Sequence, residues 1–211
     1  MDFEAARARL IKQLSTEIRD KRVLAAMSRI PRELFVPLES QRLAYEDRPL
    51  PIGWEQTISQ PYIIALMTEA LELTGREKVL EVGTGSGYQA AILAELCRQV
   101  ITVERVPALA GTAKHVLDGL GYTNIEIHTA EETIGWKHGA PYDAILVTAA
   151  APSVPNDLLA QLAMDGRMVI PVGSRYVQEL CKVTKHKDKN PVQNLGGCRF
   201  VALIGKGAWE E

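Results

Sequence analysis

The sequence predicts a Rossmann-like, doubly wound α/β fold with a mostly parallel sheet of seven strands, an antiparallel C-terminal strand pair and an N-terminal helical extension. Past Gly75, short apolar runs alternate with segments of helix length, which is typical of parallel sheets built from strand–helix–strand units. One of these runs enters a glycine-rich turn at residues 83–87 and then a helix, as in nucleotide-binding folds. The 211 residues are enough for one domain with a sizeable core.

The N-terminal part is expected to be helical and then irregular. Apolar residues recur at helical spacing over residues 3–18, and Asp20 is a suitable N-cap for a second short helix over 20–30. From residue 31 to 60, prolines and a glycine interrupt a polar stretch, so we expect an irregular loop, and loops of this length usually serve function. Pro61 is a favoured first helical residue, and another helix should begin there.

The rest of the chain is expected to supply the sheet. Strands are predicted at residues 78–82, 100–104, 125–128, 143–147, 167–172, 177–184 and 199–205. Pro107 and Pro155 mark the starts of two of the intervening helices. The last two strands have no segment of helix length between them, so they should pair antiparallel.

Composition excludes several classes of protein. Hydrophobic residues make up 46% and charged residues 24%, which indicates neither disorder nor a fibrous protein. The formal net charge of −2 gives no general attraction to a phosphate backbone, so nucleic acid is not an expected partner. The lysine-rich stretch at 182–189 lies between two predicted strands, which favours a solvated hairpin over a binding patch.

The cysteines and the N-terminus bear on location. Cys97, Cys181 and Cys198 are odd in number, widely spaced and without CxxC pairing, which supports neither a disulfide framework nor a zinc site. Residues 1–10 offer no apolar core for a signal peptide, and no run approaches the length of a membrane span. We therefore expect a cytoplasmic protein without a metal and without a membrane partner.

The turn at residues 83–87 is the sharpest functional feature. Its glycines allow positive φ angles and close approach of a ligand, and backbone amides at the following helix start could hold an anionic group. A dinucleotide fingerprint would need its third glycine at position 88, which is Tyr88. The series Gly83, Gly85, Gly87 after Glu81 is instead the pattern of methyltransferase motif I. S-adenosylmethionine carries a sulfonium and an ammonium, so an acidic residue beside the glycines makes electrostatic sense.

Glu104 ends the second predicted strand, 21 residues after Gly83, where a carboxylate can accept hydrogen bonds from both ribose hydroxyls. A glutamate at a strand end is by itself more often a solvated charge. The glycine turn before it favours the ribose role, and Arg105 beside it is a further candidate for the cofactor site.

Several segments together carry a resemblance to one family. They are Ala44–Asp47, Leu50–Gly53, Thr57–Tyr62, Glu81–Tyr88, Pro141–Ile145, Thr148–Pro152 and Ile170–Gly173. With them, the sequence resembles the protein-L-isoaspartate (D-aspartate) O-methyltransferase family over nearly the whole chain. The glycine motif alone indicates only a methyltransferase, whereas Thr57-Ile-Ser-Gln-Pro followed by that motif is far more specific.

The resemblance implies a class I methyltransferase fold and a reaction. A methyl group of S-adenosylmethionine would pass to the free carboxyl of L-isoaspartyl residues, and in some members D-aspartyl residues, in damaged proteins, which initiates their repair. Residues 1–211 would form a single methyltransferase domain. Within it, residues 1–60 would supply N-terminal helices and an active-site loop, and residues 61–211 would supply the cofactor-binding core and C-terminal strands.

The resemblance also implies site residues. Ser59 falls on the family's active-site serine, and its neighbours Thr57 and Ile58 would line the cofactor pocket. Within the turn, Thr84 and Ser86 would contribute with the glycines. A simpler interpretation of Ser59 is that it caps the helix starting at Pro61, and the two roles can coexist.

Two positions depart from the family pattern. The family usually has Gly-Asp-Gly after the third strand, where the acid meets the adenine amino group, and this chain has Ala130-Glu131-Glu132. Glu131 would keep a hydrogen-bond acceptor at this position. Ala130 and Glu132 replace glycines, so the backbone has less conformational freedom on both sides of it. Near the C-terminus, Ala202 stands where proline is usual.

Methyl transfer to a carboxylate requires few catalytic groups from the protein. A carboxylate is already ionised at neutral pH, so methyl transfer needs no strong general base, and positioning should dominate. This agrees with four histidines that fall in no triad and no metal-ligand spacing. Ser59 would orient the attacking carboxylate and would not act as a nucleophile.

Two rival functions remain open from the sequence. A small-molecule or RNA methyltransferase could share the cofactor half, because the fold does not fix the acceptor. A nicotinamide dehydrogenase or a non-catalytic nucleotide-binding module is disfavoured by the glycine spacing. The expected partners are isoaspartyl-containing proteins and peptides, and a monomer is expected.

Overall fold

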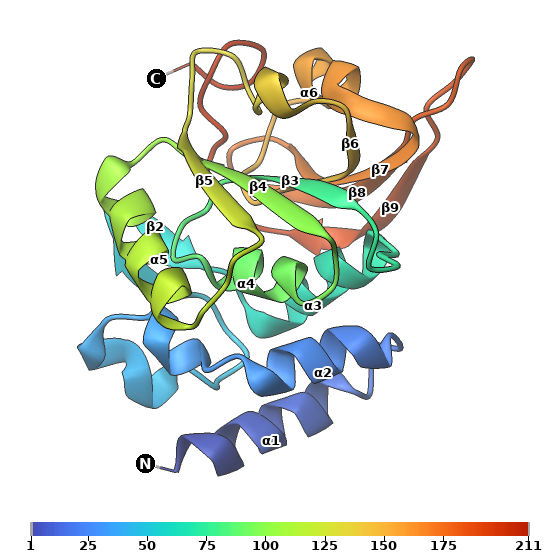
Figure 1. The fold of residues 1–211 in the computed structure, drawn as a ribbon. Helices are drawn as coiled ribbons and strands as arrows, with labels where there is room; N and C mark the ends of the chain where they lie inside the picture. Colours follow the sequence, from blue (N-terminus) through green and yellow to red (C-terminus); the bar gives the residue numbers. More distant parts are fainter. Residues whose placement is uncertain (1, 211) are drawn as a thin grey trace.

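A computed structural model describes residues 2–210 of the chain (Figure 1). Its centre is a seven-stranded sheet with the order β5-β4-β3-β6-β7-β8-β9. The strands of the chain are β1 Leu50–Gly53, β2 Gln56–Ile58, β3 Lys78–Val82, β4 Gln99–Glu104, β5 Ile125–Thr129, β6 Tyr142–Val147, β7 Leu162–Gly173, β8 Gln178–Thr184 and β9 Val192–Cys198. Pairing is parallel from β5 to β7 and antiparallel between β7, β8 and β9. The predicted seven-stranded, mostly parallel sheet with an antiparallel C-terminal pair is confirmed.

Helices cover both faces of this sheet. They are α1 Phe3–Leu14, α2 Lys21–Arg29, α3 Pro61–Ala70, α4 Tyr88–Ala94, α5 Pro107–Gly119 and α6 Asn156–Gln161, with short 3-10 helices η1 Arg32–Phe35, η2 Leu38–Leu43 and η3 Lys137–Gly139. Figure 1 shows α1 to α4 stacked on one side of the sheet and α6 on the other. Asp20 caps α2 as predicted, because its carboxylate accepts a hydrogen bond from the amide of Arg22 at 2.8 Å.

The core is divided by the sheet into two apolar layers. Val79 of β3 packs in the layer under α1 to α4, and its neighbour Leu80 packs in the layer under α6. Successive side chains of a strand point to opposite faces, so a sheet covered on both sides needs apolar residues at nearly every position. The uninterrupted apolar strands of the sequence have this origin.

The loop predicted for residues 31–60 is more ordered than expected. It contains η1, η2 and an antiparallel hairpin of β1 and β2, closed by Trp54 and Glu55 at φ angles of 48° and 58°. A two-residue hairpin turn of this kind is usually signalled by asparagine and glycine. The missing turn signal explains why the sequence did not indicate the hairpin.

The prediction of a strand at residues 199–205 was wrong. The partner of β8 is β9 at Val192–Cys198, because the connection after β8 closes early, with the amide of Thr184 bonded to the carbonyl of Pro191 at 3.1 Å. Residues after that turn pair with β8 first, although Gly196 and Gly197 weaken their strand signal. The apolar run that follows makes only isolated bridges, such as Ala150 to Ala202.

Glu77 anchors the start of the central strand. Its buried carboxylate accepts hydrogen bonds from the Thr74 hydroxyl at 2.7 Å and from the amides of Thr74, Gly75 and Arg76 at 2.9 to 3.0 Å. Burial opposes ionisation of this carboxyl, but these hydrogen bonds outweigh it and hold its pKa below the usual value. The turn before β3 is therefore organised around one charged side chain.

Replacing Glu77 by Gln should lower the free energy of unfolding at pH 7 by about 1.5–3 kcal/mol, because hydrogen bonds to a charged group are lost. Since the folded pKa is depressed, this stabilisation is present above the unfolded pKa and is lost as pH falls through the folded pKa. Urea unfolding of both proteins across acid and neutral pH would measure this. The exposed Glu17→Gln variant is the control, and an equal loss in both variants would contradict the role of Glu77.

Candidate functional site

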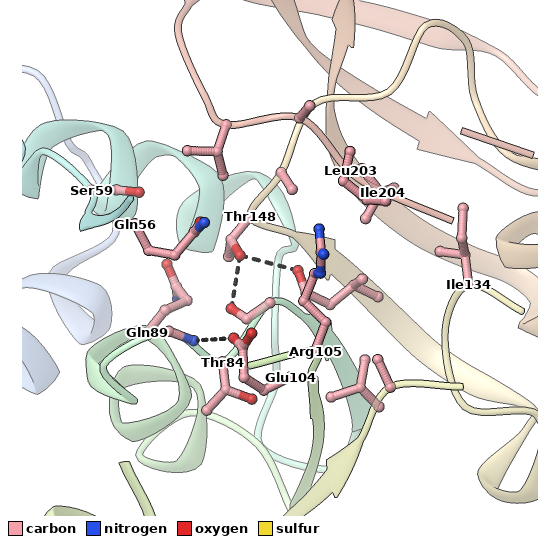
Figure 2. A pocket seen from close by; sticks show the side chains of 18 of the residues that line it. Gln56, Ser59, Thr84, Gln89, Glu104, Arg105, Ile134, Thr148, Leu203 and Ile204 are labelled. Atoms are coloured by element: carbon pink, nitrogen blue, oxygen red, sulfur yellow. Dashed lines mark hydrogen bonds between the residues drawn. The ribbon is translucent and has the colours of Figure 1, made fainter. Parts of the chain in front are cut away.

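A cavity that is open to solvent lies where the parallel strands end. Register aligns Val82 of β3 with Val103 of β4 and with Val147 of β6, so the loops that follow these strands meet at one edge of the sheet. Ligands bind at this edge in open α/β sheets. Figure 2 shows Ser59 at one end of the cavity and Ile134, Leu203 and Ile204 at the other.

The glycine turn forms one wall of the cavity, and its backbone packs closely against neighbouring side chains. Gly83, Gly85 and Gly87 have φ angles of 99°, 53° and 89°, values that favour glycine. A Cβ at Gly83 would overlap the Thr148 hydroxyl, which donates to the carbonyl of Gly83 at 2.7 Å. A Cβ at Gly87 would press on Leu117 of α5 at 3.2 Å. Gly83 and Gly85 line the cavity, whereas Gly87 lets α4 pack against α5.

The amides of this turn are mostly engaged within the protein. Those of Gly83 and Thr84 donate to the carbonyl of Val103 at 2.9 and 3.2 Å, and the amide of Gly87 donates to the carbonyl of Thr84. The amide of Gly85 donates to Glu104 at 2.8 Å. These four amides of the turn are therefore already bonded within the protein, and the prediction for the amides at the start of α4 stays a prediction.

Glu104 and Arg105 both line the cavity (Figure 2). One carboxylate oxygen of Glu104 accepts from the amide of Gly85 and the other from the amide of Val106 at 2.9 Å. These two bonds fix the carboxylate at the end of β4. A carboxylate has about four acceptor positions, so Glu104 can still accept hydrogen bonds from a ligand.

Glu81 lies beside the cavity but not on its wall. Its side chain is fully buried, and one oxygen accepts from the Thr102 hydroxyl at 2.6 Å, which in turn meets the Thr84 hydroxyl at 2.7 Å. Burial raises the pKa of Glu81 to about 8, helped by the nearby charge of Glu104. This shift favours the neutral form of Glu81 at pH 7, and the side chain is connected to the cavity through the hydroxyls of Thr102 and Thr84.

Ser59 lines the cavity together with Thr57 and Ile58. It does not cap α3, whose N-cap is Gln60, with no hydrogen bond from a capping side chain of that residue. The cap comes from elsewhere, since Asp47 accepts from the amide of Tyr62 at 2.8 Å and from the side chain of Gln60 at 3.1 Å. The capping interpretation of Ser59 is wrong, and its hydroxyl is available to the cavity.

Ser86 and Glu131 complete the predicted residues that line the cavity. Glu131 follows β5, is exposed, and lies 3.5 Å from the Nε2 atom of His138. Of all the predicted site residues, only Glu81 and Gly87 stay off the wall.

Sequence reasoning missed several lining residues. They include Gln56, Gln89, Thr148, Ile134, Leu203 and Ile204. Thr148 begins one of the segments that carried the family resemblance, and Gln89 follows the glycine turn, so position could have suggested both. Leu203 follows Ala202, a position already compared with the family pattern, whereas nothing in the local pattern marks Ile134 and Ile204, which the fold brings from far along the chain.

A metal site and a membrane-spanning helix are both absent from the part of the chain that the structure describes. Within residues 2–210, no group of three or more His, Cys, Asp or Glu side chains is placed to hold a metal ion. In the same part of the chain, no helix combines the length and apolar character needed to cross a membrane.

Comparison with known proteins agrees with this geometry. The family model described as "Protein-L-isoaspartate(D-aspartate) O-methyltransferase (PCMT)" matches residues 5–208. A protein-L-isoaspartate O-methyltransferase of Syntrophus aciditrophicus is 55% identical, over 98% of this chain and 97% of that protein. One of Geobacter metallireducens is 53% identical, over 99% and 98% respectively.

Solved structures agree in fold. One named protein-L-isoaspartate O-methyltransferase is 29% identical, with a TM-score of 0.84 over 96% of this chain and 67% of that chain. A putative member from Plasmodium falciparum, solved in complex with S-adenosyl-L-homocysteine, has a TM-score of 0.81 at 24% identity, over 95% and 99% of the two chains. This second likeness bears on the fold alone.

Replacing Glu81 by Gln should change how stability depends on pH. The raised pKa means that stability contributed by protonated Glu81 is present below the unfolded pKa and is lost as pH rises toward about 8. Glutamine does not titrate, so its stability relative to wild type should improve by more than about 1.4 kcal/mol between pH 5 and pH 8.

Thermal or urea unfolding at both pH values would measure this difference. The exposed Glu39→Gln variant should keep a constant offset. If the difference for Glu81→Gln also stays constant, Glu81 is ionised in the folded protein.

Proposed function

The chain belongs to the protein-L-isoaspartate(D-aspartate) O-methyltransferase family, and we propose that it methylates the free carboxyl of L-isoaspartyl residues with S-adenosylmethionine. Methylation of such residues begins the repair of damaged proteins. The observation that carries the proposal is one cavity that joins the segment of Ser59 to the glycine turn and Glu104.

The residues of the cavity fit the cofactor. Gly83 and Gly85 permit close approach, and Glu104 is held by two amides with acceptor positions left for the ribose hydroxyls. We assign the adenine end to the apolar wall near Ile134 and to the acceptor Glu131. When bound, S-adenosylmethionine supplies a methyl group already activated by its sulfonium.

The remaining predicted residues are assigned supporting places in the same site. Thr57, Ile58, Thr84, Ser86 and Arg105 would contact the cofactor from the wall. Gly87 would support the site indirectly, by allowing α4 to pack against α5. Glu81 would hold Thr84 in place through its hydrogen bond with Thr102.

The protein's part in the reaction is positioning. The substrate carboxylate is ionised at neutral pH, so no side chain needs to remove a proton. Ser59 donates a hydrogen bond that orients this carboxylate, and the hairpin of β1 and β2 beside it shields the reacting atoms from water. Holding the reacting atoms in line can supply about 7–11 kcal/mol of the barrier reduction.

The setting of the enzyme is also a proposal. Residues 1–211 act as a single methyltransferase domain, with helices and active-site loop in 1–60 and the cofactor-binding core in 61–211. We propose a cytoplasmic monomer that acts on proteins and peptides, without nucleic acid or membrane partners. The net charge of −2 and the free thiols of all three cysteines support this setting.

A methyl-transfer assay tests the proposed function. Matched peptides that differ only in an isoaspartyl or aspartyl residue would be offered with labelled S-adenosylmethionine. Methylation of the isoaspartyl peptide alone is expected. Equal methylation of both peptides, or methylation of neither by a protein that binds S-adenosylhomocysteine, would overturn the proposal.

Replacing Glu104 by Gln should weaken binding of S-adenosylhomocysteine by about 10- to 100-fold, because a charged acceptor becomes neutral, at a cost of about 1.5–3 kcal/mol. The new NH₂ group would also face one of the amides of Gly85 and Val106. Calorimetric titration of the folded variant would measure the affinity, with exposed Glu126→Gln as the control. Unchanged affinity would make the ribose assignment wrong.

Replacing Ser59 by Ala should lower kcat on an isoaspartyl peptide by about 10- to 100-fold, which corresponds to the loss of a hydrogen bond to a charged group. Stability should hardly change, since Ser59 caps no helix. Steady-state kinetics and thermal unfolding would be compared with exposed Ser15→Ala. Wild-type turnover at saturating cofactor would remove Ser59 from the catalytic site.

A further inference from the structure

Arg32 is a fully buried cation behind the acceptor end of the cavity. Its Nε atom donates to the carbonyl of Ala44 at 2.8 Å, and its Nη2 atom donates to the carbonyl of Ser59 at 2.9 Å. Its guanidinium carbon lies 5.0 Å from the centre of the Tyr88 ring. Burial lowers the pKa of Arg32 to about 10, so the side chain remains charged at neutral pH.

This charge is expensive to bury. Within residues 2–210, no carboxylate forms an ion pair with Arg32, although Asp47 attracts it from a greater distance, and its Nη1 atom is buried without a hydrogen-bond partner. A buried charge usually has a paired counter-ion, because desolvation costs several kcal/mol. Packing alone would be served as well by an apolar side chain of similar size, so the guanidinium calls for another explanation.

The three contacts of Arg32 connect the segment that contains Ser59 to the helix that follows the glycine turn. Ala44 precedes the hairpin, Ser59 follows it, and Tyr88 is the first helical residue after the glycine turn. Tyr88 is itself buried and packs edge-on against Phe35, with ring centres 5.3 Å apart. The guanidinium therefore connects the backbone of the acceptor segment to the helix that starts at the cofactor turn.

The geometry points to Arg32 as a positioning residue that sets Ser59 against the glycine turn and so aligns the acceptor carboxylate with the methyl group. This inference rests on the proposed function and on the role of Ser59 in it. A guanidinium is a planar fork of fixed donors, so two carbonyls bonded to it are held at a fixed angle. On the other side of Ser59, Asp47 holds Gln60 and the start of α3.

The choice of arginine follows from these contacts. Lysine would carry the same charge, but its ammonium cannot hold two carbonyls in one plane while stacking on an aromatic ring. Methionine would fill much of the space without charge or donors. Arg32→Lys keeps the charge but loses the planar arrangement of donors. Arg32→Met keeps much of the side-chain volume but loses both the charge and the donors. Comparing the two variants therefore shows which of these properties matters.

The test measures kcat and KM on an isoaspartyl peptide, affinity for S-adenosylhomocysteine and melting temperature. Arg32→Met should lose about 10- to 100-fold in kcat, since a displacement of about 1 Å can cost 10²-fold. Its affinity for S-adenosylhomocysteine should stay within about threefold, because Arg32 contacts no wall residue on the cofactor side. Arg32→Lys should fall between Arg32→Met and wild type, and Arg22→Met, at an exposed arginine of α2, should match wild type.

A double-mutant cycle with Ser59→Ala decides whether Arg32 acts through Ser59. If it does, adding Arg32→Met to Ser59→Ala should change kcat by less than about threefold, because the hydroxyl to be positioned is already gone. Equal losses in both backgrounds would overturn the inference, as would wild-type kcat in folded Arg32→Met or a loss of cofactor affinity as large as the loss of kcat.

Stability is treated separately from turnover in this test. If Arg32→Met does not fold, Arg32→Lys is judged by the same criteria, in the same two backgrounds. Failure of the wild-type enzyme to methylate the isoaspartyl peptide would overturn the proposed function and this inference with it, whereas the outcomes above overturn this inference alone.

Discussion

The contact between the glycine turn and Thr148 is the constraint on which the site depends. The end of β3 is held from both sides: Thr148, after β6, bonds the carbonyl of Gly83, and the carbonyl of Val103 in β4 accepts the amides of Gly83 and Thr84. A side chain at position 83 would have no room beside the Thr148 hydroxyl. Once three strand ends are fixed at one edge, Glu104 and the loop after β5 have determined places relative to the turn.

Charge is distributed unevenly around this fixed turn. Beneath it, burial and the nearby Glu104 raise the pKa of Glu81 and favour its neutral form, while Glu104 and Arg105 lie side by side on the cavity wall. Behind the acceptor end, Arg32 keeps its positive charge in the core. An anionic acceptor would therefore lie near a charge of the opposite sign. Buried groups of this kind act on their neighbours in a low dielectric, where electrostatic interactions are stronger than in water.

The sequence pattern predicted those features that depend on interactions between residues close together in the chain. The bounds of β3 at 78–82 and the cap at Asp20 follow from apolar runs and capping residues that act over a few positions. The hairpin at Trp54 and Glu55 was not predicted, because its turn consists of residues that seldom adopt positive φ. The last strand was misplaced because two glycines weaken β9, while a stronger apolar run follows it. Long-range contacts, such as Asp47 capping α3, have no sequence signal at all.

The loop after β5 illustrates how a departure from the family pattern can be absorbed. The backbone of this loop is held at both ends: the amide of Ala130 bonds the carbonyl of Glu104 at 2.9 Å, and Gln161 of α6 bonds the carbonyl of Ile134 and the amide of Trp136, both at 2.8 Å.

These anchors do not require glycine at positions 130 and 132. Replacing the two glycines therefore alters the freedom of the loop but leaves its attachment points. Ile134 and Ser59 lie at opposite ends of the cavity (Figure 2), so we expect the departure to affect cofactor affinity at the adenine end. In the proposed reaction, turnover would depend on alignment at the other end, where the carbonyl of Ser59 accepts from Arg32 and no contact to the loop after β5 is involved.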